Sequence, residues 1–401
     1  MKLRHRDDVT EYERKNLFYL LTISALYTLG LNMSNIFVNI FLWKQSHDIQ
    51  LLALFNISIY LTQLLIFIIA GKWVKRFDRV IILRVGIILI SLFFIGLLSL
   101  GSHALSVYML LGAVLGAGYG FYLLAFSVLT FEVTEPHTRD YFNSTMGTLQ
   151  SIAWMIGPLF AGYLITVLSG YKGYITIFFL SFVLFILAVI TSIFLERRRT
   201  SGQYIIKRAL QERKENPDWY RLMNAHFLQG MRDGVFLFAV GLWVFMITDR
   251  EMTIGIYNFI YAGGSLLVYQ LLNRWLKPSK RKTFILIGSV ALYGAVVWII
   301  YANTAVDLYL YGLIIGLSFP LFFAPFMSIS YDVIGKARNA RDYRVEYVVF
   351  KEIVLNFGRV ISLVLFWVGL QFFPETQWLR YSLLIFGLGY LFAMLQIRKI
   401  D

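Results

Sequence analysis

The stretch from Glu196 to Arg221 reads ERRRTSGQYIIKRALQERKENPDWYR, and 12 of its 26 residues are charged. In the whole chain only 15% of the residues are charged. The sequence on either side is strongly apolar, and each flank is about 200 residues long. A charged, helix-permissive connector between two apolar halves of equal length predicts a duplicated membrane protein.

The composition supports the same class. Hydrophobic residues make up 58% of the chain and aromatic residues 17%, which is far more apolar content than a soluble domain carries. The chain has no cysteine, which excludes a disulfide framework, a thiol nucleophile and a cysteine metal site. The first apolar run is too long for the core of a signal peptide and lacks a cleavage pattern, so we interpret it as the first span.

Twelve apolar runs are long enough to cross a hydrocarbon core of ~30 Å as helices. Six precede the connector and six follow it. The sequence therefore predicts an amino-terminal six-helix bundle (1–195), a cytoplasmic connector (196–221) and a carboxy-terminal six-helix bundle (222–401). The runs are 17–43, 49–71, 80–100, 105–131, 142–168, 173–195, 222–248, 252–273, 283–302, 306–331, 345–371 and 378–397.

Lysine and arginine predict the orientation. An even number of spans puts both termini on one side. If that side is the cytoplasm, 30 of the 37 Lys and Arg residues lie at cytoplasmic ends. This bias predicts a multi-pass protein of the cytoplasmic membrane with both termini inside. It also removes nucleic acid as a partner, because the charge is spread over short turns. The exceptions are Lys44, Lys172, Arg250 and Arg380 in opposite loops and Arg232, Lys351 and Arg359 within spans.

The two halves repeat at an offset of about 200 residues. Gly71–Arg79 (GKWVKRFDR) aligns with Asn273–Arg281 (NRWLKPSKR). Charged loop positions are harder to attribute to chance than apolar ones, so we infer a duplication. The other matches are Gly112 with Gly312, Gly116 with Gly316, Glu132 with Asp332, and Arg139, Asp140 and Tyr141 with Arg341, Asp342 and Tyr343.

With twelve spans, a six-plus-six duplication and a charged central loop, the whole chain resembles the major facilitator superfamily. The loop between spans 2 and 3 of that family usually reads Gly-x-x-x-Asp-Arg-x-Gly-Arg-Arg. This chain keeps Gly71, Arg76 and Arg79, but has Lys75 for the Asp, Asp78 for the Gly and Val80 for the last Arg. In the family the Asp caps a neighbouring helix and latches the cytoplasmic side, a role that Asp78 would have to fill here.

The resemblance implies an all-α polytopic membrane protein with twelve transmembrane helices in two six-helix bundles. In span 5, Gly157, Pro158 and Gly162 resemble the family's Gly-Pro motif, which is commonest in proton-linked exporters, although Ala153 replaces a Gly usually found upstream. We expect these three residues to serve helix packing.

Enzymatic constellations are missing from the sequence. None of the five His residues belongs to a metal-ligand pair at helical spacing, and no phosphate-binding Gly-x-x-x-x-Gly-Lys loop is present. We therefore expect no enzyme activity, no cofactor and no metal. Gly112, Gly116 and Gly120 form a small-residue stripe in span 4, which favours close helix packing.

Polar groups inside spans are costly, about 2.5–3.5 kcal/mol for a central Arg, and so they are the candidates for function. Arg359 lies seven residues past Glu352 on one face of span 11, about 10 Å deeper. Asp233 lies twelve residues past Arg221, about 18 Å along span 7. The candidate substrate or proton-binding residues are Asn32, Asn35, Asn39, Tyr119, Tyr122, His226, Gln229, Arg232, Asp233, Glu352, Asn356 and Arg359.

These groups allow two interpretations. Arg359 could form a fixed ion pair with Asp233 or Glu352 that holds the second half together. Alternatively, the charged groups face a central cavity and bind substrate or carry a proton. The Asn residues of span 1 fit interhelical bonding or cavity lining equally, and Tyr119 and Tyr122 fit packing better than contact with substrate. The candidate gate residues at the cytoplasmic ends are Gly71 and ten charged residues: Lys75, Arg76, Asp78, Arg79, Glu132, Arg139, Asp140, Asp332, Arg341 and Asp342.

We interpret the chain as a monomeric secondary active transporter of a small solute, working by alternating access and driven by protons, and acting either as an importer or as an exporter. Its partners would be the lipid bilayer, a small-molecule substrate and protons. One alternative is a flippase or exporter of an amphipathic or lipid-linked substrate. Another is a non-transporting membrane scaffold or sensor that kept the fold.

Overall fold

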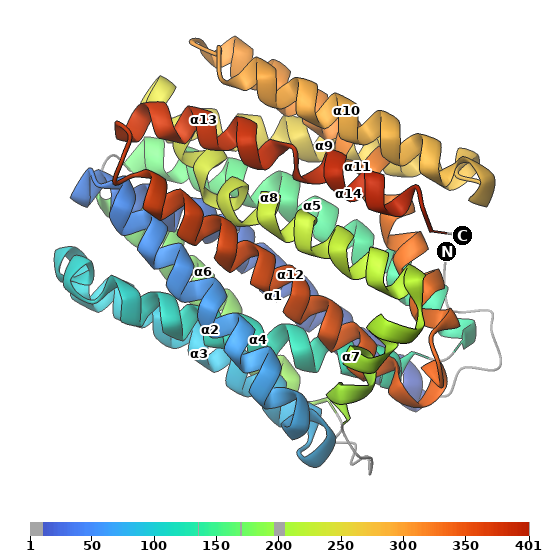
Figure 1. The fold of residues 1–401 in the computed structure, drawn as a ribbon. Helices are drawn as coiled ribbons and strands as arrows, with labels where there is room; N and C mark the ends of the chain where they lie inside the picture. The colour runs from blue at the N-terminus through green and yellow to red at the C-terminus, as the bar shows by residue number, and fades with distance from the viewer. Residues whose placement is uncertain (1–10, 135, 169–170, 196–204, 401) are drawn as a thin grey trace.

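In a computed structural model, residues 11–134, 136–168, 171–195 and 205–400 are described, and these are helices joined by short turns (Figure 1). The first half contains α1 Glu11–Ser46, α2 Ile49–Arg76, α3 Arg79–Leu100, η2 Gly101–Ser106, α4 Tyr108–Val133, α5 Pro136–Leu168 and α6 Tyr171–Ile193. The connector contains α7 Ile206–Glu215. The second half contains α8 Pro217–Thr248, α9 Glu251–Trp275, η3 Pro278–Lys280, α10 Arg281–Ile299, α11 Ala305–Lys336, α12 Ala340–Gly369, α13 Glu375–Gly387 and α14 Gly389–Ile397.

Eleven described segments are long and apolar enough to cross a membrane, with α13 and α14 together forming one of them. The twelfth span is α12, whose 30 residues suffice in length but include Lys351, Glu352 and Arg359 near the middle. The predicted twelve-helix fold is therefore confirmed. Lys351 is buried, and α12 packs against α8 and α2, so other helices cover part of its polar surface.

The first six spans pack chiefly on one another, with α1 against α5 and α6, and α4 against α2 and α3. The last six do the same, with α8 against α12 and α14, and α11 against α9 and α10. Two broad contacts join the halves, α5 with α9 and α2 with α12, and a smaller one joins α1 with α8. Figure 1 shows α2 and α12 running side by side.

The sequence repeat reappears as repeated packing. A Cβ built on Gly116 of α4 would collide with the carbonyl oxygen of Ile59 in α2. A Cβ on Gly316 of α11 would lie 2.5 Å from the carbonyl oxygen of Tyr261 in α9. In both halves, then, the fourth span crosses the second at backbone contact, which only glycine allows at these positions.

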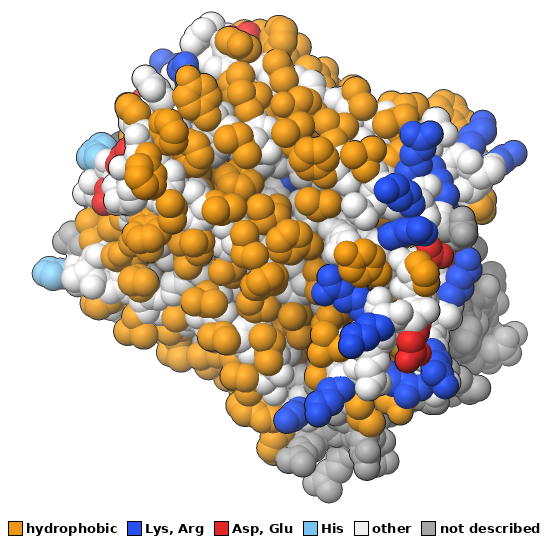
Figure 2. Space-filling view, viewed as in Figure 1, with side chains coloured by type: hydrophobic (Ala, Val, Ile, Leu, Met, Phe, Trp, Pro, Cys, Tyr) orange, Lys and Arg blue, Asp and Glu red, His pale blue; other side chains and the backbone are white. Residues whose placement is uncertain are grey.

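The two ends of the bundle differ in charge. Figure 2 shows Lys and Arg side chains gathered at the end where α7 lies, while the middle of the visible surface is hydrophobic. We call this the connector end. The α7 helix is held on the second half: Trp219 Nε1 donates to the Ala209 carbonyl oxygen at 3.0 Å, and Tyr347 donates to Glu212 at 3.4 Å.

Candidate functional site

The centre of the second half is built around a close crossing of α8 and α12. A Cβ on Gly230 would collide with the carbonyl oxygen of Leu355, and a Cβ on Gly358 with that of Phe227. A Cβ on Gly234 would lie 2.8 Å from the Cα of Arg359. Because the two backbones touch here, Asp233 and Arg359 are held at the same level of the bundle. The sequence analysis missed these three glycines, although Gly230 and Gly234 have the small-xxx-small spacing.

Asp233 accepts three hydrogen bonds. Tyr390 of α14 donates its hydroxyl at 2.9 Å, and Gln229 Nε2 and Arg232 Nη1 donate at 3.3 Å each. The Arg232 guanidinium lies between the rings of Phe236 and Tyr390, 4.1 and 4.4 Å from their centroids. A carboxylate with three donors, one of them a cation, is satisfied in its ionised form. This cluster ties α14 to α8.

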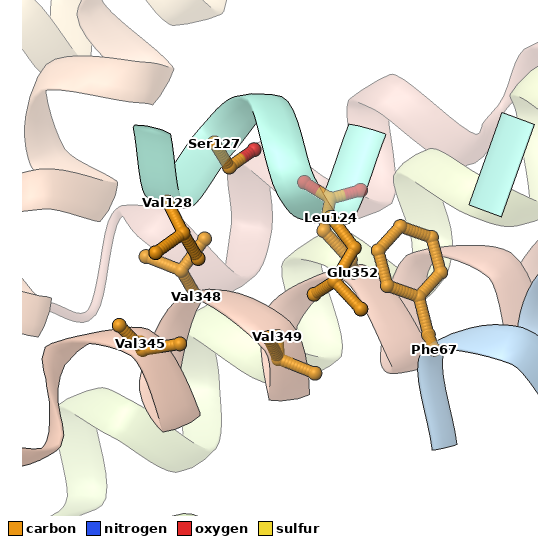
Figure 3. Close-up of a pocket in the computed structure, with 8 residues that line it drawn as sticks. All are labelled: Phe67, Leu124, Ser127, Val128, Val345, Val348, Val349 and Glu352. Atoms are coloured by element: carbon orange, nitrogen blue, oxygen red, sulfur yellow. The ribbon is translucent and has the colours of Figure 1, made fainter. Parts of the chain in front are cut away.

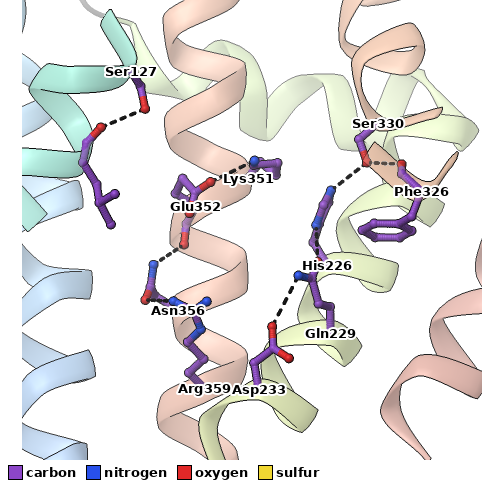
Figure 4. A network of polar contacts seen from close by, with 11 residues as sticks. Ser127, His226, Gln229, Asp233, Phe326, Ser330, Lys351, Glu352, Asn356 and Arg359 are labelled. Carbon is purple, nitrogen blue, oxygen red and sulfur yellow. Dashed lines mark hydrogen bonds and ion pairs between the residues drawn. The ribbon is translucent and has the colours of Figure 1, made fainter. Parts of the chain in front are cut away.

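His226 continues this network toward α11 (Figure 4). Its Nδ1 lies 3.0 Å from Gln229 Oε1, and its Nε2 lies 3.0 Å from the Ser330 hydroxyl. The Ser330 hydroxyl donates to the Phe326 carbonyl oxygen of its own helix at 2.9 Å, which leaves its oxygen to accept from Nε2–H of His226. The predicted row His226, Gln229 and Asp233 therefore forms one hydrogen-bonded chain inside the second half.

A second row runs along α12 (Figure 4). Glu352 pairs with Lys351 at 2.8 Å. Asn356 Nδ2 donates to the Glu352 carbonyl oxygen at 2.9 Å, and Arg359 Nη1 donates to Asn356 Oδ1 at 3.2 Å. The predicted ion pair of Arg359 with Asp233 or Glu352 is not formed. Each of these acids is instead paired with the basic residue next to it in the sequence, Arg232 or Lys351.

Two residues of the α12 row reach the interface between the halves. Glu352 lines a narrow crevice of about 10 Å³ between α12 on one side and α2 and α4 on the other (Figure 3). That volume is about the space of one water molecule. The guanidinium of Arg359 lies 5.3 Å from the ring centroid of Tyr60 in α2. The first half contributes Phe67, Leu124, Ser127 and Val128 to the crevice, and the second half contributes Val345, Val348, Val349 and Glu352.

The Asn side chains of span 1 form their hydrogen bonds within the first half. Asn56 of α2, which the sequence analysis missed, donates to Asn39 Oδ1 at 2.7 Å, and both side chains are buried. Tyr119 donates to Asn35 Oδ1 at 3.5 Å. Asn32 donates to the Thr28 carbonyl oxygen of its own helix at 2.7 Å. Tyr122 is buried with its ring 3.5 Å from the ring of Tyr27.

The candidate gate residues are only partly described. Asp78 Oδ1 accepts from the Val80 N–H at 2.9 Å and so caps α3, the helix that it precedes. Arg79 and Gly71 are buried. In the second half Arg281 Nη1 lies 2.5 Å from Asp332 Oδ2, which joins α10 to α11. The other predicted gate side chains lie outside the described part of the structure: Lys75, Arg76, Glu132, Arg139, Asp140, Arg341 and Asp342.

The Gly-Pro motif of α5 packs against two other helices. A Cβ on Gly157 would lie 3.1 Å from the Cβ of Asn32 in α1. A Cβ on Gly162 would lie 2.8 Å from the carbonyl oxygen of Glu251 in α9, and a Cβ on Gly255 would lie 2.9 Å from that of Pro158. The motif thus gives backbone-to-backbone contact between the halves, a role that the sequence analysis did not assign to it.

At the end opposite the connector, a charged contact joins the halves. Lys44 of α1 pairs with Glu251 of α9 at 2.9 Å. Tyr174 of α6 donates to the same carboxylate oxygen at 2.8 Å. Gln371, just after α12, donates to Gln50 of α2 at 3.1 Å. None of these five polar residues was predicted as a site, because each lies at the end of a span, where polar groups are common.

This geometry is that of a helical membrane protein whose first six and last six spans meet at α5–α9 and α2–α12, with Glu352 and Arg359 at the second of these contacts. The family model described as Major Facilitator Superfamily matches residues 20–343. The chain belongs to this superfamily.

The chain is also similar to two bacterial proteins in sequence and to one solved structure in fold. The chain is 45% identical to the Bacillus subtilis (strain 168) protein YqgE over 94% of this chain and 87% of that protein. It is 47% identical to a Geobacillus stearothermophilus protein described as lying in the sodM 3′ region, over 49% of this chain and 92% of that protein. The fold is similar to the crystal structure of the human organic anion transporter MFSD10, with a TM-score of 0.67 at 10% identity over 96% and 99% of the two chains.

Proposed function

We propose that this transporter moves a small solute across the cytoplasmic membrane by alternating access and couples that movement to protons. Alternating access rocks one half of such a protein against the other around a site near the midplane. A side chain that couples solute movement to protons must change its surroundings when the halves move. The groups that can do so are those at the interface, and the observation that carries this proposal is the position of Glu352.

Glu352 fits the role of proton carrier better than Asp233 does. The Glu352 side chain is 25% exposed and has one basic partner, and it faces helices of the other half across the crevice. The Asp233 side chain is 12% exposed, and its three donors all belong to α8 and α14 of its own half. Separation of α2 and α4 from α12 would expose Glu352 to water and leave the Asp233 cluster intact.

We assign the connector end to the cytoplasm. The support is the concentration of basic side chains at that end, as the positive-inside rule requires (Figure 2). In this conformation the Lys44–Glu251 pair closes the outer end, and the crevice at Glu352 is too narrow for a solute. Loading from the cytoplasm therefore begins with separation of α2 and α12.

The experiment uses purified protein in liposomes that contain a trapped pH-sensitive dye. A thermal-shift screen with a metabolite library first finds a solute that stabilises the protein. Addition of that solute should then move protons across the membrane in wild-type vesicles. Glu352→Gln should keep solute exchange at equal concentrations but lose accumulation driven by a pH gradient, because a neutral side chain cannot release a proton.

Glu215→Gln is the matched control, since Glu215 is an exposed acid that pairs with Arg338 on the surface. It should behave as wild type in both assays. Gradient-driven accumulation that survives in Glu352→Gln would remove Glu352 from the coupling mechanism. A wild-type protein that moves no solute would favour the scaffold alternative.

A further inference from the structure

The charged side chains at the centre of the second half are paired, with one exception. Arg232 pairs with Asp233 at 3.3 Å, and Lys351 pairs with Glu352 at 2.8 Å. Arg359 makes no ion pair with any acidic side chain that the structure describes. An arginine is always charged. The centre of this half therefore carries one surplus positive charge.

The guanidinium of Arg359 also has unused donors. It has five N–H groups, and its hydrogen bond goes from Nη1 to the neutral amide oxygen of Asn356. Its Nε is buried and has no acceptor among the described residues. Arg359 is partly buried. Buried donors are normally satisfied, so an unmatched donor on this cation fits a ligand that supplies oxygen atoms and negative charge.

The position of Arg359 is fixed by the helix crossing described above. Gly234 of α8 leaves no room between the two helices, because a Cβ there would lie 2.5 Å from the Arg359 carbonyl oxygen. The side chain reaches the other half, where the guanidinium lies over the Tyr60 ring at 5.3 Å. The surplus charge is thus held on a rigid support at the interface where the halves separate.

We propose that Arg359 binds an oxyanion, a carboxylate or phosphate group, of the transported solute. The inference rests on the proposed transport function and names its substrate class. The planar guanidinium matches the two oxygens of such a group in a paired hydrogen bond. Asn356 orients the guanidinium, and Tyr60 covers one of its faces from the opposite half. The bound solute neutralises the surplus charge before access to the site switches from one side of the membrane to the other.

The test measures binding to the purified full-length protein by thermal shift and needs no knowledge of the natural solute. The probes are inorganic phosphate, benzoate and phenyl phosphate, with benzamide and benzylammonium as neutral and cationic counterparts of benzoate. The oxyanions should stabilise the wild type, and the counterparts should not. Arg359→Gln should need at least tenfold more oxyanion for the same stabilisation, and Arg359→Lys should fall between the two.

Arg380→Gln is the matched control, because Arg380 lies over the ring of Trp243 at 4.8 Å, away from α12. It should bind oxyanions as the wild type does. Without ligand, Arg359→Gln should still fold, since it breaks one hydrogen bond, to Asn356, and no ion pair. A variant that fails to fold, while Arg359→Lys folds, would make Arg359 a structural charge and overturn the inference. Equal response of wild type and Arg359→Gln to every oxyanion, including no response in either, would overturn it too.

The binding test and the transport test can fail independently of each other. If Glu352-dependent proton movement is present but no oxyanion binds through Arg359, the substrate class is wrong and the proposed function stands. If oxyanions bind through Arg359 but no solute crosses the membrane, the site is real and the transport proposal fails.

Discussion

Lys44 Nζ lies 2.9 Å from Glu251 Oε1, and this ion pair joins α1 of the first half to α9 of the second at the end opposite the connector. Tyr174 donates to the same oxygen at 2.8 Å, so three helices meet at one carboxylate. The ammonium also lies 5.3 Å from the ring centroid of Phe245 in α8. Under the proposed alternating access, this contact breaks each time the end opposite the connector opens.

Neutralising this pair should shift the protein toward conformations that are open at the outer end. Lys44→Gln should favour the open state by about 1 kcal/mol, because a partly exposed pair contributes little more than that. This is roughly a fivefold change in the ratio of open to closed protein. Distances between spin labels on α1 and α9 would measure it. Lys172→Gln, an exposed lysine at the same end, is the control, and an equal shift in both variants would argue against a specific tie.

The Asp233 cluster should behave as a structural unit. Asp233→Asn should lower the free energy of unfolding by roughly 3–5 kcal/mol, because it leaves the Arg232 guanidinium without its counter-charge. Tyr390→Phe should cost about 2 kcal/mol, because the hydroxyl donates to Asp233 at 2.9 Å and accepts from Arg232 at 3.2 Å. Thermal unfolding in detergent would show both losses. Adding Arg232→Gln to Asp233→Asn should recover stability, whereas adding Arg359→Gln should not; the reverse pattern would show that Asp233 compensates Arg359.

The α8–α12 crossing should tolerate no side chain at Gly230. Gly230→Ala places a methyl group on the carbonyl oxygen of Leu355, and overpacking of this kind costs about 1–3 kcal/mol. Gly294 of α10 offers a matched control, because a Cβ there meets nothing within 4 Å. Gly294→Ala should be neutral or stabilise by up to about 1 kcal/mol. Unfolding temperatures that fall equally in both variants would contradict the backbone contact.

The predicted orientation can be tested without background, because the chain has no cysteine. Ser201→Cys places a thiol in the predicted connector. It should resist membrane-impermeant thiol reagents in intact cells and react once the cells are opened. A cysteine at Asn303, in the turn between α10 and α11, should do the opposite. Rapid labelling at position 201 in intact cells would show that the connector faces outward and that the predicted orientation is wrong.

The sequence predicted the spans well because apolar length alone determines which segments cross a membrane. Tyr108–Val133 and Ala305–Lys336, for example, differ from the predicted runs 105–131 and 306–331 by a few residues. It did not show that the last span is divided between α13 and α14, which end and begin at Gly387 and Gly389. That break falls inside a continuous apolar run, where composition carries no signal.

The partners of the candidate residues were harder to predict than the residues themselves. Helical periodicity puts Glu352 and Arg359 on one face, and a pair between them was one of the two interpretations left open. The structure pairs Glu352 with its neighbour Lys351 because a long flexible side chain can bend back across the 100° between adjacent positions. The Asn39–Asn56 bond joins two helices, and no spacing within one helix could reveal it.

The contact between α5 and α9 has a mechanical consequence. Gly162 meets Glu251 and Gly255 meets Pro158 at the level of the main chain, and Trp154 of α5 stacks on Tyr261 of α9. Under the proposed alternating access, α5 and α9 would turn about this close backbone contact. At the other contact between the halves, α2 and α12 would instead have to part the side chains of Phe67, Val345 and Val348. The larger movement would then fall on the side of the molecule where Glu352 lies.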